Sequence, residues 1–131
     1  MENEEIKVDY TKSSPLELAK AIVRALDAKN ARDIKVLHVE EATSLTEYFV
    51  LCTGNSNTQI KSYCDEVDYK IGLGGVKPES TEGFNEASWV VMDYGPVIVH
   101  IFNRENRVFY NLEKLWSQSS EVDVSDLITE K

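Results

Sequence analysis

The chain has 131 residues, of which 42% are apolar and 28% charged, a composition typical of one soluble globular domain. It carries 14 basic and 23 acidic residues, for a formal charge of −9. Direct nucleic-acid readout is therefore not expected, because no cluster of Lys and Arg can displace the counterions of phosphates. The acidic N-terminus lacks the features of a signal peptide, and no stretch approaches the ~20 apolar residues of a membrane helix, so we expect a cytoplasmic protein.

The first predicted elements are a helix and two strands. The helix begins at Ser14, whose side chain can form a capping box with Glu17, and it ends near Lys29. The strands follow at residues 33–41 and 47–53. The second strand is apolar on both faces, which is typical of a central strand covered on two sides.

A second helix is predicted after the turn Gly54-Asn55-Ser56, with Ser56 as its cap and Gly72 as its stop. Such a junction can hold a phosphate, because helix N-termini expose unpaired N–H groups. It lacks the GK[ST] ending of a P-loop and the converging carboxylates of a magnesium site. We interpret it as a turn and a cap, and keep a nucleotide-binding or nucleotidyltransferase-type enzyme using Gly54–Ser56 as the alternative function.

A hairpin and a third helix are predicted after a glycine-rich loop at residues 73–85, which has a short extended piece near its start. Residues 88–92 and 97–102 are rich in Val and Ile, and Asp93–Pro96 supplies the turn between them. Asn103 is positioned to cap the helix. Four apolar residues then recur at helical spacing, namely Phe109, Leu112, Leu115 and Trp116.

The aromatic residues of this segment divide into two predicted groups. Phe102, Phe109 and Trp116 are assigned to the core. Tyr94 lies at the hairpin turn and Tyr110 at a polar-flanked helix position, so both are expected to be exposed. Exposed tyrosines near carboxylates are typical of binding hot spots.

No arrangement of reactive residues predicts catalysis or metal binding. Cys52 and Cys64 have the spacing of neither a disulfide framework nor a zinc site, and are predicted to be buried thiols. His38 and His100 belong to no nucleophile, base and acid motif, and His100 is expected to be half-buried and hydrogen-bonded. We therefore expect no catalytic residue, no metal and no cofactor.

The order of the elements predicts a single α/β domain, with a mixed sheet of four or five strands flanked by helices. The domain is assigned to residues 14–117. Residues 1–13 and 118–131 are acidic and are predicted to be flexible tails.

Three stretches carry a family signal when they are taken together. They are EYFVLCTGNS at residues 47–56, the Glu82-Gly83 pair before Trp89, and the segment from Asp93-Tyr94-Gly95 to NLEKLW at residues 111–116. Their combination resembles the Iojap-related family, the ribosomal silencing factors. The chain departs from the family pattern at Pro96, where Asp is common, and at Thr58, where Arg or a similar residue is common.

This resemblance implies a nucleotidyltransferase-like topology without a working catalytic site. It also implies a translational repressor that binds the large ribosomal subunit through its ribosomal protein fourteen. Occupying that face would sterically block association with the small subunit and lower translation under nutrient limitation, without a cofactor. Family members can also self-associate, so the free protein is a candidate homodimer.

An acidic and aromatic patch is the expected contact with this basic ribosomal protein. Its leading members are Trp89, Asp93, Tyr94 and Glu113, with Glu82 and Tyr110 as supporting members. We predict that the double substitution Asp93→Arg with Tyr94→Ala abolishes binding to the large subunit and leaves the thermal melt near that of the wild type.

Overall fold

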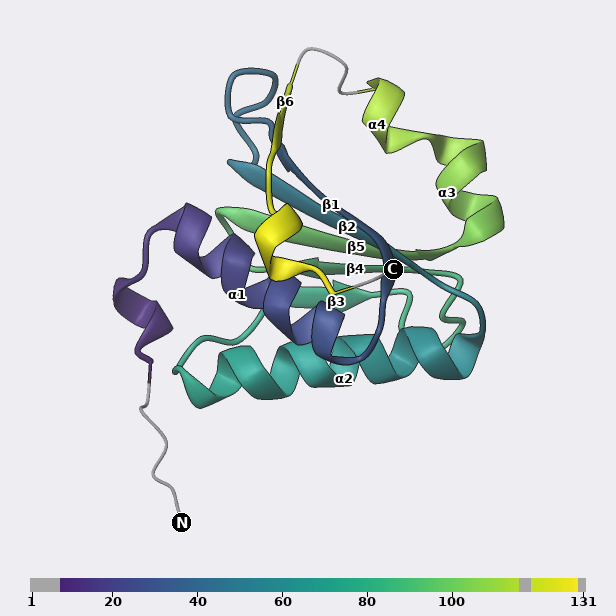
Figure 1. Cartoon of the computed structure of the whole chain (residues 1–131), viewed down its shortest axis with the longest axis horizontal. Helices are drawn as coiled ribbons and strands as arrows, with labels where there is room; N and C mark the ends of the chain where they lie inside the picture. Colours follow the sequence, from purple (N-terminus) through teal and green to yellow (C-terminus); the bar gives the residue numbers. More distant parts are fainter. Residues whose placement is uncertain (1–7, 116–118, 130–131) are drawn as a thin grey trace.

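The fold is built on a mixed sheet with the strand order β3-β4-β5-β2-β1-β6. This computed structural model describes residues 8–115 and 119–129 (Figure 1). Its strands are β1 Arg32–His38, β2 Tyr48–Gly54, β3 Ser80–Glu82, β4 Trp89–Asp93, β5 Val97–Asn103 and β6 Ser120–Val122. Strands β2 and β5 pair in parallel, and the other neighbouring strands pair antiparallel.

One face of the sheet is covered by two helices, α1 Pro15–Ala28 and α2 Asn57–Leu73 (Figure 1). Helix α1 begins with the predicted capping box, in which Ser14 and Glu17 exchange hydrogen bonds through side chain and backbone. The large core lies between these helices and the sheet. Its fully buried side chains include Ile22, Leu26, Val36, Val50, Ile60, Val67, Ile71, Val90, Val99 and Ile101.

The other face is covered only in part, by helices α3 Arg104–Tyr110 and α4 Leu112–Leu115. A smaller core lies beneath them, made of Leu37, Val39, Phe49, Leu51, Phe102 and Leu112. The predicted third helix is broken at Asn111, whose left-handed backbone (φ 47°) redirects the chain between α3 and α4. Phe102 is in the core as predicted, and Trp116 lies outside the described residues.

The C-terminal segment differs from the sequence prediction. Residues 118–131 were expected to form a flexible tail, but β6 pairs with β1, placing Val122 opposite Val36. Val124 is buried at 5% exposure, and the backbone N–H of Thr129 donates to Asp27 at 2.9 Å. The sheet therefore has six strands instead of four or five, because a short polar strand completes its edge.

The N-terminal side and the loop also differ in detail. Residues 10–12 form a short 3-10 helix, η1 Tyr10–Lys12, and the Tyr10 N–H donates to the Gly74 carbonyl at 2.9 Å. A matching 3-10 helix, η2 Ser125–Leu127, lies near the other end. The extended piece of the loop is β3, at the end of residues 73–85 and not near their start.

The glycine at the end of β2 is required by packing against α2. A Cβ atom on Gly54 would lie 2.8 Å from Ile60 Cγ1 and 3.0 Å from Tyr63 Cε2, both in fully packed surroundings. At Gly72, near the end of α2, a Cβ would meet the flexible Lys77 side chain, with Nζ at 3.1 Å. The two glycines of this helix unit therefore have different structural roles.

We expect Gly54→Ala to lower the free energy of unfolding by about 1–3 kcal/mol, because the added methyl group overpacks the core. Gly72→Ala is the control, and should raise the free energy of unfolding by about 0.5 kcal/mol, because Ala is the better helix former. Urea denaturation of both variants measures the free energy of unfolding. Equal stability of Gly54→Ala and the wild type would contradict the packing role.

Candidate protein-interaction surface

Helix α3 presents its apolar side to solvent. Among its seven residues no side chain is buried, and Val108 and Phe109 are 71% and 78% exposed. A surface helix usually turns its apolar residues toward the core. The assignment of Phe109 to the core is therefore wrong, and this part of α3 is a surface suited to contact with another molecule.

Polar contacts attach the first turn of α3 to the sheet. The Asn103 side chain caps the helix by accepting from the Asn106 N–H at 2.8 Å, as the sequence predicted. The Asn106 side-chain amide donates to the Ser88 carbonyl at 3.1 Å, and the Asn103 N–H donates to the same carbonyl at 2.9 Å. These bonds fasten α3 beside the start of β4.

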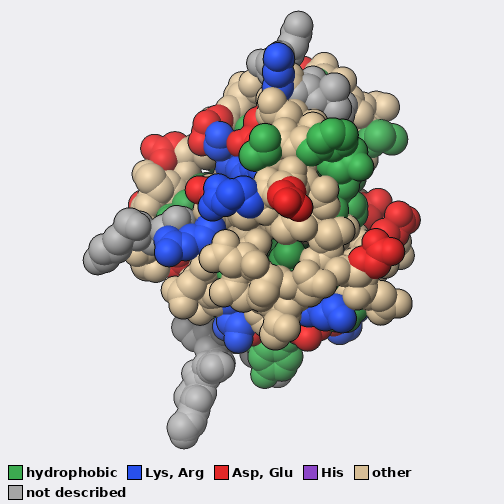
Figure 2. All heavy atoms as spheres, turned by 90° about the vertical axis from the view of Figure 1, so that its right-hand side faces the viewer, with side chains coloured by type: hydrophobic (Ala, Val, Ile, Leu, Met, Phe, Trp, Pro, Cys, Tyr) green, Lys and Arg blue, Asp and Glu red, His purple; other side chains and the backbone are tan. Residues whose placement is uncertain are grey.

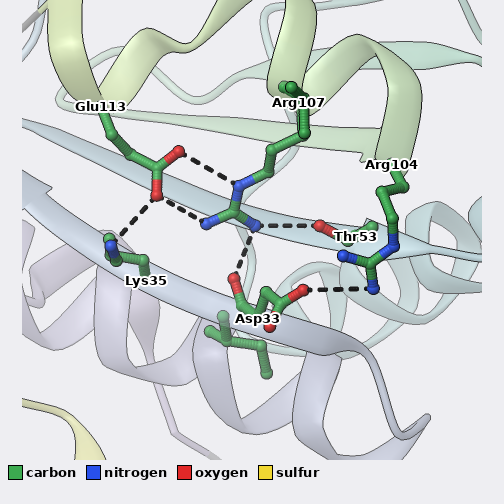
Figure 3. Close-up of a pocket in the computed structure, with 8 residues that line it drawn as sticks. Asp33, Lys35, Thr53, Arg104, Arg107 and Glu113 are labelled. Carbon is green, nitrogen blue, oxygen red and sulfur yellow. Dashed lines mark hydrogen bonds and ion pairs between the residues drawn. The ribbon is translucent and has the colours of Figure 1, made fainter.

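A second set of polar contacts is centred on Arg107, whose side chain is only 11% exposed (Figure 3). Its guanidinium donates to both carboxylate oxygens of Glu113, at 3.3 and 3.1 Å. It also donates to the Thr53 hydroxyl at 3.0 Å and to the Asp33 carbonyl at 2.6 Å. Lys35 Nζ lies 3.0 Å from Glu113 on the other side. We call these five residues the Arg107 clasp.

The electrostatics of the clasp favour its ionised form. Burial of Glu113 raises its pKa, but the hydrogen bonds and charges of Arg107 and Lys35 outweigh that effect and hold the pKa below its ordinary value. A cavity of about 420 Å³ adjoins the clasp, and the structure pairs its charged lining groups with one another. Glu113 is therefore paired within the protein, with 28% of its side chain exposed, and does not stand as a free carboxylate.

Three aromatic residues, two on α3 and one on β4, form a ledge on this face. The ring of Trp89 lies 4.6 Å from the ring of Tyr110, and the Phe109 ring packs edge-on to Tyr110 at 4.9 Å. Trp89 is half-buried, and Tyr110 is 48% exposed, as its position predicted. We call Trp89, Phe109 and Tyr110 the aromatic ledge.

Acidic residues border this ledge on the same face of the sheet. Asp93 follows Trp89 at an even spacing on β4, so the two side chains share a face. Glu82 is exposed and pairs directly with Val91 of β4, which places it on that face as well. Figure 2 shows hydrophobic side chains gathered at the upper right of this side of the molecule, with acidic side chains below them at the edge.

Tyr94 does not belong to this surface. It is 5% exposed and packs in the large core with Val90 and Met92, on the face opposite to Trp89. Burial raises the pKa of its phenol, and the hydroxyl has no hydrogen-bond partner within the described chain. The prediction that Tyr94 is exposed is wrong, and Tyr94→Ala would remove a core side chain, contrary to the expectation of an unchanged melt.

The carboxylate of Asp93 also has a local role. Its Oδ1 accepts from the Gly95 N–H at 2.8 Å and so closes the hairpin turn. Gly95 has a φ of 92°, which favours glycine. Asp93 remains half-buried on the ledge face, so it can contribute negative charge there while holding the turn.

The Gly54–Ser56 junction is a turn and a cap, as interpreted from the sequence. Ser56 Oγ accepts from the Gln59 N–H at 3.1 Å. Gln59 Oε1 accepts from the Asn55 N–H at 2.8 Å, one residue earlier than in a standard capping box. Among the described residues no three His, Cys, Asp or Glu side chains are grouped to hold a metal ion.

The cysteines and histidines lie mainly inside the fold. Cys52 and Cys64 are free and buried, as predicted, and burial raises the pKa of both thiols, to about 12 for Cys64. His100 is 7% exposed, and its Nδ1 accepts from Trp89 Nε1 at 3.2 Å. Its Nε2 has no partner in the described part of the chain. Among the described helices, none has the length and hydropathy needed to cross a membrane.

Sequence reasoning missed Phe109, Val108 and Arg107 as residues of this surface. The signal was present in part, because a polar run at residues 103–107 precedes three consecutive bulky residues, a pattern too short to show which side is buried. The contacts of Arg107 with Thr53 and Asp33 join residues 54 and 74 positions apart, which no local pattern reveals.

Comparison with known proteins identifies consistent relatives. A family model described as "Ribosomal silencing factor during starvation" matches residues 11–131. The chain is 37% identical over 107 residues to ribosomal silencing factor RsfS of Bacillus subtilis, covering 82% of this chain and 91% of that protein. It is 30% identical over 116 residues to the chloroplastic protein Iojap of Zea mays, covering 83% of this chain and 47% of that protein. A crystal structure from Chromobacterium violaceum superposes with a TM-score of 0.78 at 32% identity, covering 80% of this chain and 88% of that chain.

The burial of Tyr94 has opposite consequences for two substitutions. Tyr94→Phe should leave the free energy of unfolding unchanged or raise it, because it removes a buried hydroxyl without a partner. Tyr94→Ala should lower it by about 3 kcal/mol, because it leaves a cavity. Urea denaturation measures both, and Tyr110→Phe on the surface is the control. A wild-type midpoint for Tyr94→Ala would contradict the burial.

The burial of His100 predicts a pH dependence of stability. Desolvation lowers its pKa from 6.5 to about 4, so the unfolded chain binds this proton at a higher pH than the folded chain. The free energy of unfolding is therefore not reduced by His100 above pH 6.5. It falls as the pH drops toward 4, where the decrease due to His100 reaches about 3 kcal/mol. His100→Gln should reduce this slope in denaturation curves between pH 7 and 4, whereas His38→Gln, at a half-exposed histidine, should retain it. Parallel curves for the wild type and His100→Gln would refute the assignment.

Proposed function

Because the chain belongs to the family of ribosomal silencing factors that act during starvation, we propose that it represses translation by binding the large ribosomal subunit. The proposed contact is ribosomal protein fourteen, at the face where the small subunit docks. Occupying this face blocks subunit association by steric exclusion and lowers translation under nutrient limitation. The proposed place of action is the cytoplasm.

The family assignment agrees with the resemblance found in three stretches of the sequence. Relatives carry both the RsfS and the Iojap names, and the name ribosomal silencing factor describes a regulator. The alternative function, a nucleotidyltransferase-type enzyme at Gly54–Ser56, gains no support from the junction, where the Asn55 and Gln59 N–H groups donate to side chains of the same turn.

The observation that carries the proposal is the outward apolar side of α3. Phe109 and Tyr110 are exposed at 78% and 48%, and Trp89 supports Tyr110 from the strand below. Large aromatic side chains of this kind become anchors when a partner removes them from water. A helix that leaves such side chains exposed is best explained by a partner that covers them.

The acidic border supports a basic protein as that partner. Glu82 and Asp93 give the Trp89 face of the sheet negative charge, in a chain whose formal charge is −9. Opposite charges speed the encounter and fix the orientation, while aromatic anchors supply most of the binding energy. Ribosomal proteins that sit on RNA are basic, which matches this arrangement.

Steric exclusion requires no reaction, so the mechanism depends on affinity and position alone. The protein must bind the free large subunit tightly enough to compete with the small subunit for one face. Tyr94, Glu113 and Pro96 contribute differently from first expectation: Tyr94 and Glu113 maintain the fold and α4, and Pro96 accepts backbone bonds from Glu47 and Tyr48. Trp89, Asp93, Glu82 and Tyr110 remain proposed contact residues, and Phe109 joins them.

We expect Phe109→Ala to weaken binding to large subunits at least about tenfold, because truncating a hot-spot aromatic typically costs about 2 kcal/mol or more. Stability should stay near wild type, since the side chain is 78% exposed. Leu45→Ala is the matched control, because Leu45 is 79% exposed in the loop before β2. Cosedimentation with purified large subunits in sucrose gradients measures the affinity, and equal affinity of Phe109→Ala and the wild type would rule out this surface.

The steric mechanism has its own test in the same gradients. Binding to free large subunits but not to intact ribosomes is expected, and equal binding to both contradicts the proposed block. Purified ribosomal protein fourteen should compete for the protein. Light scattering of the free protein at several concentrations distinguishes a monomer from the candidate homodimer.

A further inference from the structure

We infer that Arg107 is the positioning residue that holds α3, and with it the aromatic ledge, in the orientation that binds the partner. The inference rests on the proposed function, because the ledge is its proposed contact surface. In this role Arg107 does not touch the partner. It affects the affinity through the Arg107 clasp, which orients α3 (Figure 3).

Helix α3 needs such a residue because other means of support are weak. It has seven residues and no buried side chain, and an isolated helix of that length is unstable in water. Most surface helices are held by burial of an apolar stripe, which α3 turns outward. We therefore assign its orientation to polar contacts and to the ring contact between Tyr110 and Trp89.

Arg107 joins α3 to three other elements at once. It bonds to Asp33 of β1, to Thr53 of β2 and to Glu113 of α4. With 11% of its side chain exposed, these charge-assisted bonds lie largely out of water, where they are strong and directional. The residue thus fixes both the distance of α3 from the sheet and the angle between α3 and α4.

Because of its position on α3, Arg107 also sets the placement of the aromatic ledge. Residues three apart share a helix face, so Arg107 and Tyr110 lie one above the other. The Arg107 carbonyl also accepts from the Asn111 N–H at 3.0 Å and closes the last turn. Asn106 fastens the other side of α3 to Ser88, next to Trp89. Two anchors therefore fix the helix, and the one at Arg107 controls the end that carries Phe109 and Tyr110.

The geometry requires a guanidinium group. Arg107 donates from its Nε, Nη1 and Nη2 atoms to four acceptor atoms on three residues, an arrangement that needs the planar fork of arginine. A lysine at the same place offers one ammonium, and Lys35 already supplies that kind of contact to Glu113. Arg107→Lys should therefore restore only part of what Arg107→Met removes.

The test compares Arg107→Met with Arg104→Met, a matched control. Arg104 lies on the same helix, loses the same charge and length, and is 67% exposed with a 3.6 Å contact to Asp33. Val23→Ala controls for general stability, because Val23 is fully buried in the core on the opposite face. Amide hydrogen exchange of residues 103–110 reports on α3, and cosedimentation reports on the affinity for large subunits.

We expect Arg107→Met to speed exchange in residues 103–110 and to weaken large-subunit binding about tenfold, as loss of charged hydrogen bonds would. Arg104→Met should do neither, and Val23→Ala should lower the unfolding midpoint without weakening binding. Arg107→Lys should fall between wild type and Arg107→Met in both measurements. Thr53→Val, an isosteric change at a buried hydroxyl, should also speed exchange in residues 103–110 and weaken large-subunit binding, but by smaller amounts than Arg107→Met. If Arg107→Met fails to fold, Thr53→Val tests the role of the clasp in its place.

Wild-type exchange in residues 103–110 of Arg107→Met would overturn the inference, and so would wild-type affinity of that variant. So would a loss of affinity in Val23→Ala as large as that in Arg107→Met, because general instability would then explain both. Failure of the proposed function is recognised separately, since Phe109→Ala then binds like the wild type. In that case faster exchange in α3 would still establish the structural half of the role of Arg107.

Discussion

The parallel pairing of β2 with β5 is the contact on which both faces of the molecule depend. Its register places Gly54 beside Asn103, so both strands end at the same edge of the sheet. From this edge the chain leaves in two directions: α2 passes over one face, and α3 begins over the other (Figure 1). Because β2 is buried along most of its length, this pairing also joins the two cores.

The two faces are unequal, and this inequality makes a docking surface possible. The large core under α1 and α2 contains most of the buried apolar side chains, and hydrophobic burial there supplies most of the stability. The smaller core under α3 and α4 is closed by Leu112 and Phe102 with few others. Helix α3 therefore exposes its apolar residues without loss of the main core. Polar contacts, chiefly those of the Arg107 clasp, hold the helix in place.

Two carboxylates that the sequence assigns to the binding patch also have partners within the fold. Asp93 closes its own turn, and Glu113 completes the Arg107 clasp. Tyr94 shows the related error for an aromatic residue. Alternation along β4 continues through Val90 and Met92 to Tyr94, so the phenol follows the core face although it stands next to the turn.

Elements whose signals lie within a few consecutive residues were predictable from the amino-acid sequence. Ser14 and Asn103 as caps, the hairpin on either side of Asp93, and the buried strand β2 were predictable because capping, turn and alternation are local chemistry. The combination of three stretches also identified the family. Four of the five proposed contact residues, Trp89, Tyr110, Glu82 and Asp93, followed from residue type.

Features that join distant segments depend on how the whole chain folds. Pairing of Val36 with Val122 turned a polar, acidic C-terminal segment into a strand, and the bond from Arg107 to Asp33 spans 74 positions. The outward turn of Phe109 likewise depends on which side of a short helix meets the sheet. Such contacts form only when the chain closes on itself, because a few neighbouring residues encode their own conformation but not the partner that the fold brings to them.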